Sequence, residues 1–176
     1  MEVTTKTKIA SVLLIAFLCT LFIRVFIIEG FIVRGDSMAP IINSGDYIFI
    51  NKLAYWGREP AREDIIVAIP RTFPNKVIKR IIGLPGERFR IENNKVVISG
   101  GRTDSGVILA EIYLASSTTP AVGTTLIQLD PEEYFALGDN RQVSIDSREL
   151  GPLDKWDIKG KVIGKVDFKS LKYTDF

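Results

Sequence analysis

An uninterrupted apolar run near the N-terminus constrains this chain more than any other part of its sequence. It covers residues 9–28 and reads IASVLLIAFLCTLFIRVFII, with Arg24 as its only charge. A helix of about 20 apolar residues is long enough to cross the hydrocarbon core of a bilayer. Arg24 lies about one turn from the end of the run, so its long side chain can reach the interface. The run therefore predicts a transmembrane helix.

Two alternatives exist for this run: a cleavable signal peptide and a buried helix of a soluble domain. A signal peptide ends in a small-x-small cleavage site, whereas residues 29–32 read EGFI. An amphipathic helix of a soluble domain has a polar face, which this run lacks. A retained anchor is therefore favoured over both alternatives.

The charges beside the run indicate its orientation. Lys6 and Lys8 lie on the short N-terminal flank, and basic flanks favour the cytoplasmic side. Arg24 and Arg34 weaken this bias. The expected division is a cytoplasmic N-terminus at residues 1–8, an anchor at residues 9–28, and a β domain outside the cytoplasm at residues 29–176.

Composition excludes several classes of site. The chain has 176 residues, which fits one domain with a small insert, and a net charge of +2, too small to suggest nucleic acid as a partner. Its single cysteine, Cys19, lies in the apolar run, which excludes disulfides, cysteine zinc sites and a thiol nucleophile. The absence of histidine excludes a Ser-His-Asp triad and H-E-x-x-H metal sites. A nucleophilic serine would need a carboxylate or a lysine of lowered pKa as its base.

Short β-prone segments alternate with turns after the run, which predicts a mainly β domain. Phe31–Val33 is one such segment, and Ser37 follows it in the sequence GDSMAP. Pro40 prevents a helix from continuing through this stretch, so Ser37 is expected in a turn that exposes its hydroxyl. Gly-Asp-Ser alone indicates only turn chemistry, and the rest of the chain decides whether Ser37 is catalytic.

Two adjacent charges interrupt an apolar segment farther along. Val77–Ile82 has the pattern of a strand buried on both faces, yet Lys79 and Arg80 lie in its middle. Neighbouring residues of a strand point to opposite faces, and a buried charge needs a partner. One of the two is therefore expected to face the interior or a site, unless this is an exposed edge strand with two solvated charges.

Three further segments have a distinct composition. Residues 89–129 predict a small β insert, beginning with a hairpin that turns at Asn93-Asn94. Residues 138–148 contain two serines, two aspartates and two arginines, as a hydrogen-bonded network requires, although a solvated turn has a similar composition. The aromatic stretch at residues 53–57 fits either the core or a membrane-interface contact.

Taken in order, four motifs resemble those of the bacterial type I signal peptidases (leader peptidases), membrane-bound serine endopeptidases that remove signal peptides. GDSMAP, GDYIFINK, KRIIGLPGE and GDNRQVSIDSR follow an anchor in a chain without histidine. The match covers the anchor and most of residues 29–90 and 130–165. It implies a twisted, partly barrel-like antiparallel β core with a small β insert, preceded by one transmembrane helix.

The resemblance also implies roles for individual residues. Ser37 matches the nucleophile and Lys79 the general base, while Ser144 matches a serine whose hydroxyl holds the lysine amine. Asp146 and Arg148 match an ion pair that supports the loop. Asp139 and Arg141 match the structural start of that loop. The residues that match the walls and pockets of the substrate site are Phe31, Val33, Met38, Ile42, Val77 and Ile78.

Chemistry and partners follow from these roles. An apolar setting can lower the pKa of Lys79 enough for the amine to act as a base, whereas Lys52, a possible rival, lies at a strand end where a solvated charge is expected. The implied substrates are preprotein signal peptides with small residues at the first and third positions before the cut. The resemblance implies a monomer at the lipid bilayer of the bacterial cell, with no metal, cofactor or nucleic acid.

Three positions depart from the family pattern. Gly35 occupies a position where some members carry a hydroxyl that helps to bind the oxyanion, so the second donor is not identified. Glu87 and Gln142 replace more usual residues away from the chemistry. Two other classes share some of these features: a self-cleaving repressor-like domain, which would carry a DNA-binding domain in place of an anchor, and a non-enzymatic anchored β module, which would leave Lys79 without a role.

Overall fold

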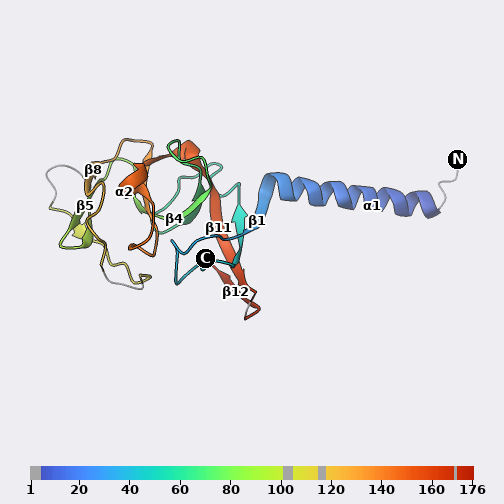
Figure 1. The fold of residues 1–176 in the computed structure, drawn as a ribbon. Coiled ribbons are helices and arrows are strands. Elements are labelled where there is room, and N and C mark those ends of the chain that lie inside the picture. The colour runs from blue at the N-terminus through green and yellow to red at the C-terminus, as the bar shows by residue number, and fades with distance from the viewer. Residues whose placement is uncertain (1–4, 101–104, 115–117, 169) are drawn as a thin grey trace.

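A long N-terminal helix leads directly into a mainly antiparallel β domain (Figure 1). The computed structural model describes residues 5–100, 105–114, 118–168 and 170–176. Its elements, in chain order, are α1 Thr5–Phe22, η1 Ile23–Ile27, β1 Ile28–Ile32, β2 Tyr47–Asn51, β3 Ile65–Ala68, β4 Val77–Gly83, β5 Arg88–Glu92, β6 Lys95–Ser99, β7 Val107–Ile108, β8 Leu126–Gln128, β9 Glu133–Leu137, α2 Ser147–Leu150, β10 Leu153–Asp154, η2 Lys155–Asp157, β11 Ile158–Asp167 and β12 Lys172–Asp175.

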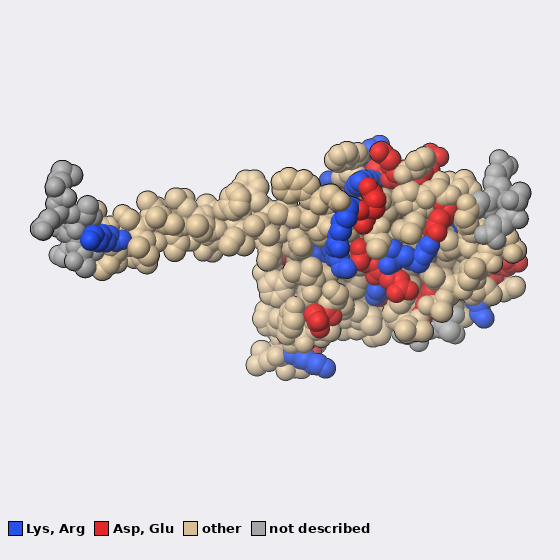
Figure 2. All heavy atoms as spheres, turned by 180° about the vertical axis from the view of Figure 1, so that it is seen from behind, with Lys and Arg blue, Asp and Glu red and all other residues tan. Residues whose placement is uncertain are grey.

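The helix is exposed along its length and projects from the β domain. Residues Thr7–Ile27 are long and apolar enough to cross a membrane. On the face of the helix that Figure 2 shows, basic side chains lie only near the end far from the β domain. The last turn, η1, has π-helical hydrogen bonding, and β1 begins at the next residue. Ile28, expected as the end of the anchor, therefore opens the first strand. The Lys52 amine donates a hydrogen bond to the carbonyl of Val25 at 2.8 Å, and this bond links the end of the helix to the β domain.

The larger sheet has the strand order β1-β2-β11-β3-β4-β9-β10, with β12 paired to β11. Its pairs are antiparallel, and the sheet curls into half of a barrel (Figure 1). The predicted antiparallel, partly barrel-like core is confirmed. The late strand β11 lies between β2 and β3, so it joins a β1–β2 part to a β3–β4–β9–β10 part.

A second sheet, of order β7-β6-β5-β8, is built from residues 88–128. Its central hairpin turns at Asn93 and Asn94, whose φ angles are 51° and 59°. Asparagine tolerates positive φ better than most residues, so the hairpin forms where the sequence predicts it. The rings of Phe89 and Phe135 stack with centroids 4.1 Å apart, which fixes this sheet against β9 of the larger one.

Strand β4 lies inside the larger sheet, between β3 and β9. Residues 78–83 are all buried, including both Lys79 and Arg80. The alternative of an exposed edge strand with two solvated charges is therefore wrong. The stretch at 53–57 divides: Ala54 packs inside, whereas the Trp56 side chain is exposed.

Candidate active site

Ser37 and Lys79 lie together, although 42 residues separate them in the chain. Lys79 Nζ is 3.0 Å from Ser37 Oγ, within hydrogen-bond distance. Strand β1 ends at Ile32, and Ser37 occupies the turn that follows, while Lys79 projects from the third position of β4. Ser37 is partly exposed in its turn, whereas Lys79 is buried in the interior strand β4, and the two groups meet where the turn after β1 approaches β4.

The surroundings of Lys79 favour its neutral form. Its side chain is 4 % exposed, and burial lowers the pKa of the amine from the usual 10.5 to about 8. The carboxylates of Asp146 and Asp139 oppose this shift, and the Arg148 guanidinium adds to it. Desolvation prevails because an ammonium loses its hydration when it is buried. At neutral pH, a fraction of the molecules therefore carries an amine able to accept a proton.

Arg80 faces the other side of β4 and anchors the loop that follows β9. Its guanidinium donates to both carboxylate oxygens of Asp139, from Nε at 2.8 Å and from Nη2 at 2.6 Å, and to the carbonyl of Glu63. The pair is buried, with the ring of Tyr113 4.1 Å from the guanidinium carbon. A buried charge without its partner is strongly destabilising, so this pair holds residue 139 beside Lys79.

A second buried ion pair shapes the same loop. Asp146 accepts hydrogen bonds from Nε and Nη2 of Arg148, both at 2.9 Å, and from the backbone N–H of Gly138. The loop is also tied to the nucleophile turn, because the N–H of Asn140 donates to the carbonyl of Ser37 at 2.9 Å. The composition of residues 138–148 thus reflects a network and not a solvated turn.

Arg141 connects this loop to the smaller sheet. Its guanidinium donates to the Glu111 carboxylate, to the hydroxyl of Thr119 and to the carbonyl of Gly138. Both ends of the Arg141–Glu111 pair are buried. Glu111 was missed in the sequence because the insert carries no motif, and a single glutamate in a polar stretch gives no signal of a partner 30 residues away.

Ser144 lies in the site but does not contact the lysine amine through a hydrogen bond. Its hydroxyl is buried and has no hydrogen-bond partner among the residues that the structure describes. The hydroxyl and the Ser37 carbonyl oxygen both crowd against Gly138, where an added Cβ would lie 2.2 Å and 2.4 Å from them. Gly138 is therefore required by close packing at the point where loop and nucleophile turn meet.

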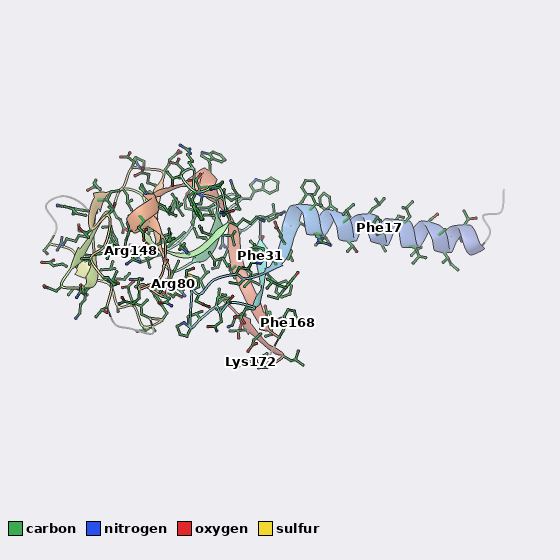
Figure 3. The ribbon with its side chains drawn as sticks, viewed as in Figure 1. Phe17, Phe31, Arg80, Arg148, Phe168 and Lys172 are labelled. Atoms are coloured by element: carbon green, nitrogen blue, oxygen red, sulfur yellow. The ribbon has the colours of Figure 1, made fainter. Side chains whose placement is uncertain are left out.

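A cleft of about 850 Å³ opens beside Ser37 and Lys79. Among the side chains expected to bind substrate, it is lined by Phe31, Val33, Met38, Val77 and Ile78. Ile42, expected in the same set, is completely buried in the core beneath the cleft and packs there with neighbours that include Met38. In Figure 3, Phe31 lies on the helix side of the molecule, with Arg80 and Arg148 farther from the helix.

The cleft includes residues that the sequence did not point to. Val143 and Ile145, from the loop after β9, line it together with Asn140 and, on the opposite approach, Phe73. The side chains of Val143 and Ile145 are exposed, in contrast to their neighbours in the loop. The alternation of apolar and polar residues in 143–146 indicates that Val143 and Ile145 share one face of the loop. It does not indicate that this face lies beside Ser37, which only the folded structure shows.

The remaining sequence candidates lie outside the chemistry. Lys52 forms an ion pair with Glu29 at 3.2 Å, and Glu87 pairs with Arg62 and caps the turn at Leu84. Gly35 has a φ of 97° and open space where a side chain would be. Across the described part of the chain, no group of three or more cysteine, aspartate or glutamate side chains is arranged to hold a metal ion.

A serine hydroxyl lies beside a buried lysine amine in a cleft, in a chain without histidine, and this arrangement fits a serine hydrolase. Comparison with known families agrees with this class. The family described as "Signal peptidase, peptidase S26" matches residues 6–168. The chain therefore belongs to the signal peptidase family and is a serine endopeptidase, a hydrolase that cleaves signal peptides.

Two bacterial relatives, matched by sequence, support the same assignment. Signal peptidase I of Bacillus amyloliquefaciens is 35% identical over 172 residues, which covers 93% of this chain and 84% of the relative. Signal peptidase I P of Bacillus subtilis subsp. natto is 33% identical over 157 residues, covering 84% and 82%. A crystal structure of a signal peptidase I from Enterococcus faecalis V583 has a TM-score of 0.49 and 30% identity, covering 59% of this chain and 97% of that one.

The family membership also excludes the two other classes of protein that the sequence allowed. A self-cleaving repressor-like domain and a non-enzymatic β module both disagree with a family match that spans residues 6–168.

Proposed function

We propose that this chain is a membrane-bound serine endopeptidase that cleaves signal peptides from exported preproteins after small-x-small sites, with Ser37 as nucleophile and Lys79 as general base. The observation that carries this proposal is the 3.0 Å contact between Ser37 Oγ and the amine of the buried Lys79. A nucleophile within hydrogen-bond reach of a base is the geometric requirement for covalent catalysis.

The reaction begins with neutral Lys79. Its amine takes the proton of the Ser37 hydroxyl as Oγ attacks the scissile carbonyl carbon and forms a tetrahedral intermediate. When the intermediate collapses, the C–N bond breaks, and the ammonium returns the proton to the leaving nitrogen. This step leaves an acyl-enzyme. Lys79, neutral again, then removes a proton from water, whose oxygen attacks the ester carbonyl. As the bond between the acyl carbon and Oγ breaks, the ammonium returns this proton to Oγ, which regenerates Ser37 and neutral Lys79.

The loop after β9 supports this chemistry. Asp146 with Arg148, and Asp139 with Arg80, hold the loop backbone against the nucleophile turn, and Arg141 fastens the loop from the other side. The Ser144 hydroxyl, free to rotate and without a partner among the described residues, holds the lysine amine once the serine has lost its proton. The N–H of Ser37 donates to the oxyanion, and the open space at Gly35 leaves room for the substrate carbonyl.

The cleft binds the signal peptide as an added strand. Val77–Lys79 pair with β3 on one side, whereas β9 pairs with β4 only from Arg80 onward. Strand β1 is an edge strand of the described sheet. Two unpaired backbone edges therefore face the cleft, and an extended peptide can hydrogen-bond to them. Met38, Val33 and Ile78 form the floor, and their tight packing leaves shallow pockets for small side chains.

The apolar helix anchors the enzyme in the cytoplasmic membrane of a bacterial cell. It crosses the bilayer once, with the N-terminus inside and the β domain on the extracytoplasmic side. The protein acts there as a monomer, and its site lies at the surface of the membrane that holds the apolar segment of the substrate. This shared location raises the effective concentration of the substrate.

The test is cleavage of a model precursor by the full-length protein in detergent. Wild type, Ser37→Ala, Lys79→Ala and the control Lys95→Ala, which removes an exposed amine in β6, are compared, and the cut site is read by mass spectrometry. Cleavage after a small-x-small site by wild type and control alone is the expected result. Near-normal turnover by Lys79→Ala would exclude Lys79 as the base. Near-normal turnover by Ser37→Ala would exclude Ser37 as the nucleophile.

A further inference from the structure

Two exposed apolar side chains stand in the cleft next to the Ser37–Lys79 pair. Val143 is 62% exposed and Ile145 is 51% exposed, and both line the cleft that Ser37 and Lys79 also line. Single exposed apolar residues are common on protein surfaces. These two are distinguished by their place, because they lie two residues apart in one loop and both line the cleft where a substrate would be cut.

The loop that carries them is held by buried contacts, and these contacts fix which of its side chains face outward. Residues 143–146 alternate between exposed and buried, with Ser144 and Asp146 directed inward. Asp146 is held by Arg148, and the N–H of Ser144 donates to the carbonyl of Asn140 at 3.1 Å. Because the inward residues are anchored, Val143 and Ile145 are held outward over the cleft without an ordering cost when a ligand binds.

Their position relative to the direction of the substrate is given by the fold. Phe31 lines the cleft, and Figure 3 shows it closer to the helix than Arg80 and Arg148, the second of which lies in α2, directly after the loop of Val143 and Ile145. In the proposed function, the apolar part of a signal peptide comes from the membrane, on the helix side. The chain that follows the cut therefore leaves past the loop of Val143 and Ile145.

We propose that Val143 and Ile145 form a subsite for an apolar side chain in the first two residues after the cleaved bond, that is, at the start of the released protein. This inference rests on the proposed function and names a substrate preference of the same site. The ligand class follows from chemistry. Contact between branched aliphatic side chains and another apolar side chain removes apolar surface from water, which stabilises the complex, whereas a polar or charged side chain brings no such stabilisation.

The experiment measures cleavage of internally quenched peptides by the full-length enzyme in detergent. All peptides keep alanine at the first and third positions before the cut, and carry leucine or asparagine, which are similar in size, at the first or second position after it. We expect kcat/KM for the better leucine peptide to exceed that of its asparagine partner about tenfold in wild type. In Val143→Asn/Ile145→Asn, this ratio should fall to about two or less.

Controls separate the subsite from general effects. The ratio is taken within each enzyme, so a uniform loss of activity cancels. Val107→Asn/Ile108→Asn places the same change on two side chains of β7 that are 73% and 58% exposed and do not line the cleft; this variant should keep the wild-type ratio. If the variant Val143→Asn/Ile145→Asn cleaves neither peptide, the ratio of kcat/KM between leucine and asparagine peptides is measured with Val143→Ala/Ile145→Ala.

Each outcome decides the inference. Equal rates on leucine and asparagine peptides in wild type would overturn it and leave the proposed function intact, and so would a wild-type ratio in the loop variants. No cleavage of any peptide by wild type would instead overturn the proposed function, and this inference with it.

Discussion

Replacing Lys79 by methionine is expected to stabilise the folded protein at neutral pH. The buried amine has a pKa of about 8, against a usual value of 10.5. At about 1.4 kcal/mol per pH unit, burying the ammonium costs the folded state about 3 kcal/mol when the lysine is protonated. Methionine removes this cost and loses one hydrogen bond to Ser37, worth about 1 kcal/mol. The expected net gain at pH 7 is about 2 kcal/mol.

The gain should depend on pH in a definite direction. Below pH 8, Lys79 is protonated in both folded and unfolded chains, so the full cost is present. Between pH 8 and 10.5, the unfolded chain binds more protons than the folded one, so the stability of wild type rises with pH. The advantage of Lys79→Met should therefore shrink as pH rises, reaching about zero near pH 9.5.

Urea unfolding of the full-length protein in detergent, followed by tryptophan fluorescence at pH 7, 8 and 9.5, measures both effects. Lys95→Met, at an exposed position in β6, is the matched control and should change stability little at any of these pH values. A Lys79→Met variant no more stable than wild type at pH 7 would refute the reasoning, because it would mean that the amine bears no desolvation cost. A gain independent of pH would refute the assignment of that cost to protonation.

Three further predictions concern activity and the loop. The kcat/KM of wild type should rise with pH along an acid limb centred near pH 8, and be about tenfold below its plateau at pH 7; a profile flat from pH 6 to 9 would contradict an amine base. Asp139→Ala should cost about 3 kcal/mol in urea unfolding, because it leaves Arg80 buried without its partner; a cost under about 1 kcal/mol would show the pair to be dispensable. Gly138→Ala should lower kcat by about 100-fold or more, because its Cβ would lie 2.4 Å from the Ser37 carbonyl oxygen; retention of wild-type kcat, read from initial rates, would show that the turn tolerates this displacement.

Features that depend on local pattern were predictable from the sequence. The apolar run and the Asn93-Asn94 hairpin each follow from composition or periodicity within about ten to twenty residues. The burial of β4 does not follow in this way, because the same residues allowed an exposed edge strand until the pairing of β4 with β3 and β9 was known. The opposite facing of Lys79 and Arg80 also follows from the strand period. Their pairing with particular partners does not.

Those partners are set by tertiary geometry. Arg80 pairs with Asp139, 59 residues away, and Arg141 with Glu111 in a segment without a motif. Ile42 has the character of a pocket residue, but the turn after Ser37 directs it into the core. The sequence pattern of a turn does not show which of its side chains face a cleft and which face the core. This can be read only from the folded structure.

The place of β11 in the sheet has a consequence for how Ser37 and Lys79 are held together. Ser37 belongs to the β1–β2 part of the larger sheet and Lys79 to the β3–β4–β9–β10 part, and among the described strands β11 is the one paired with both parts. That strand is formed by residues 158–167, close to the end of the chain. A chain that lacks residues 158–167 loses the strand pairing that joins the part carrying Ser37 to the part carrying Lys79. The closeness of Ser37 and Lys79 is thus supported by a remote strand, none of whose residues lines the cleft.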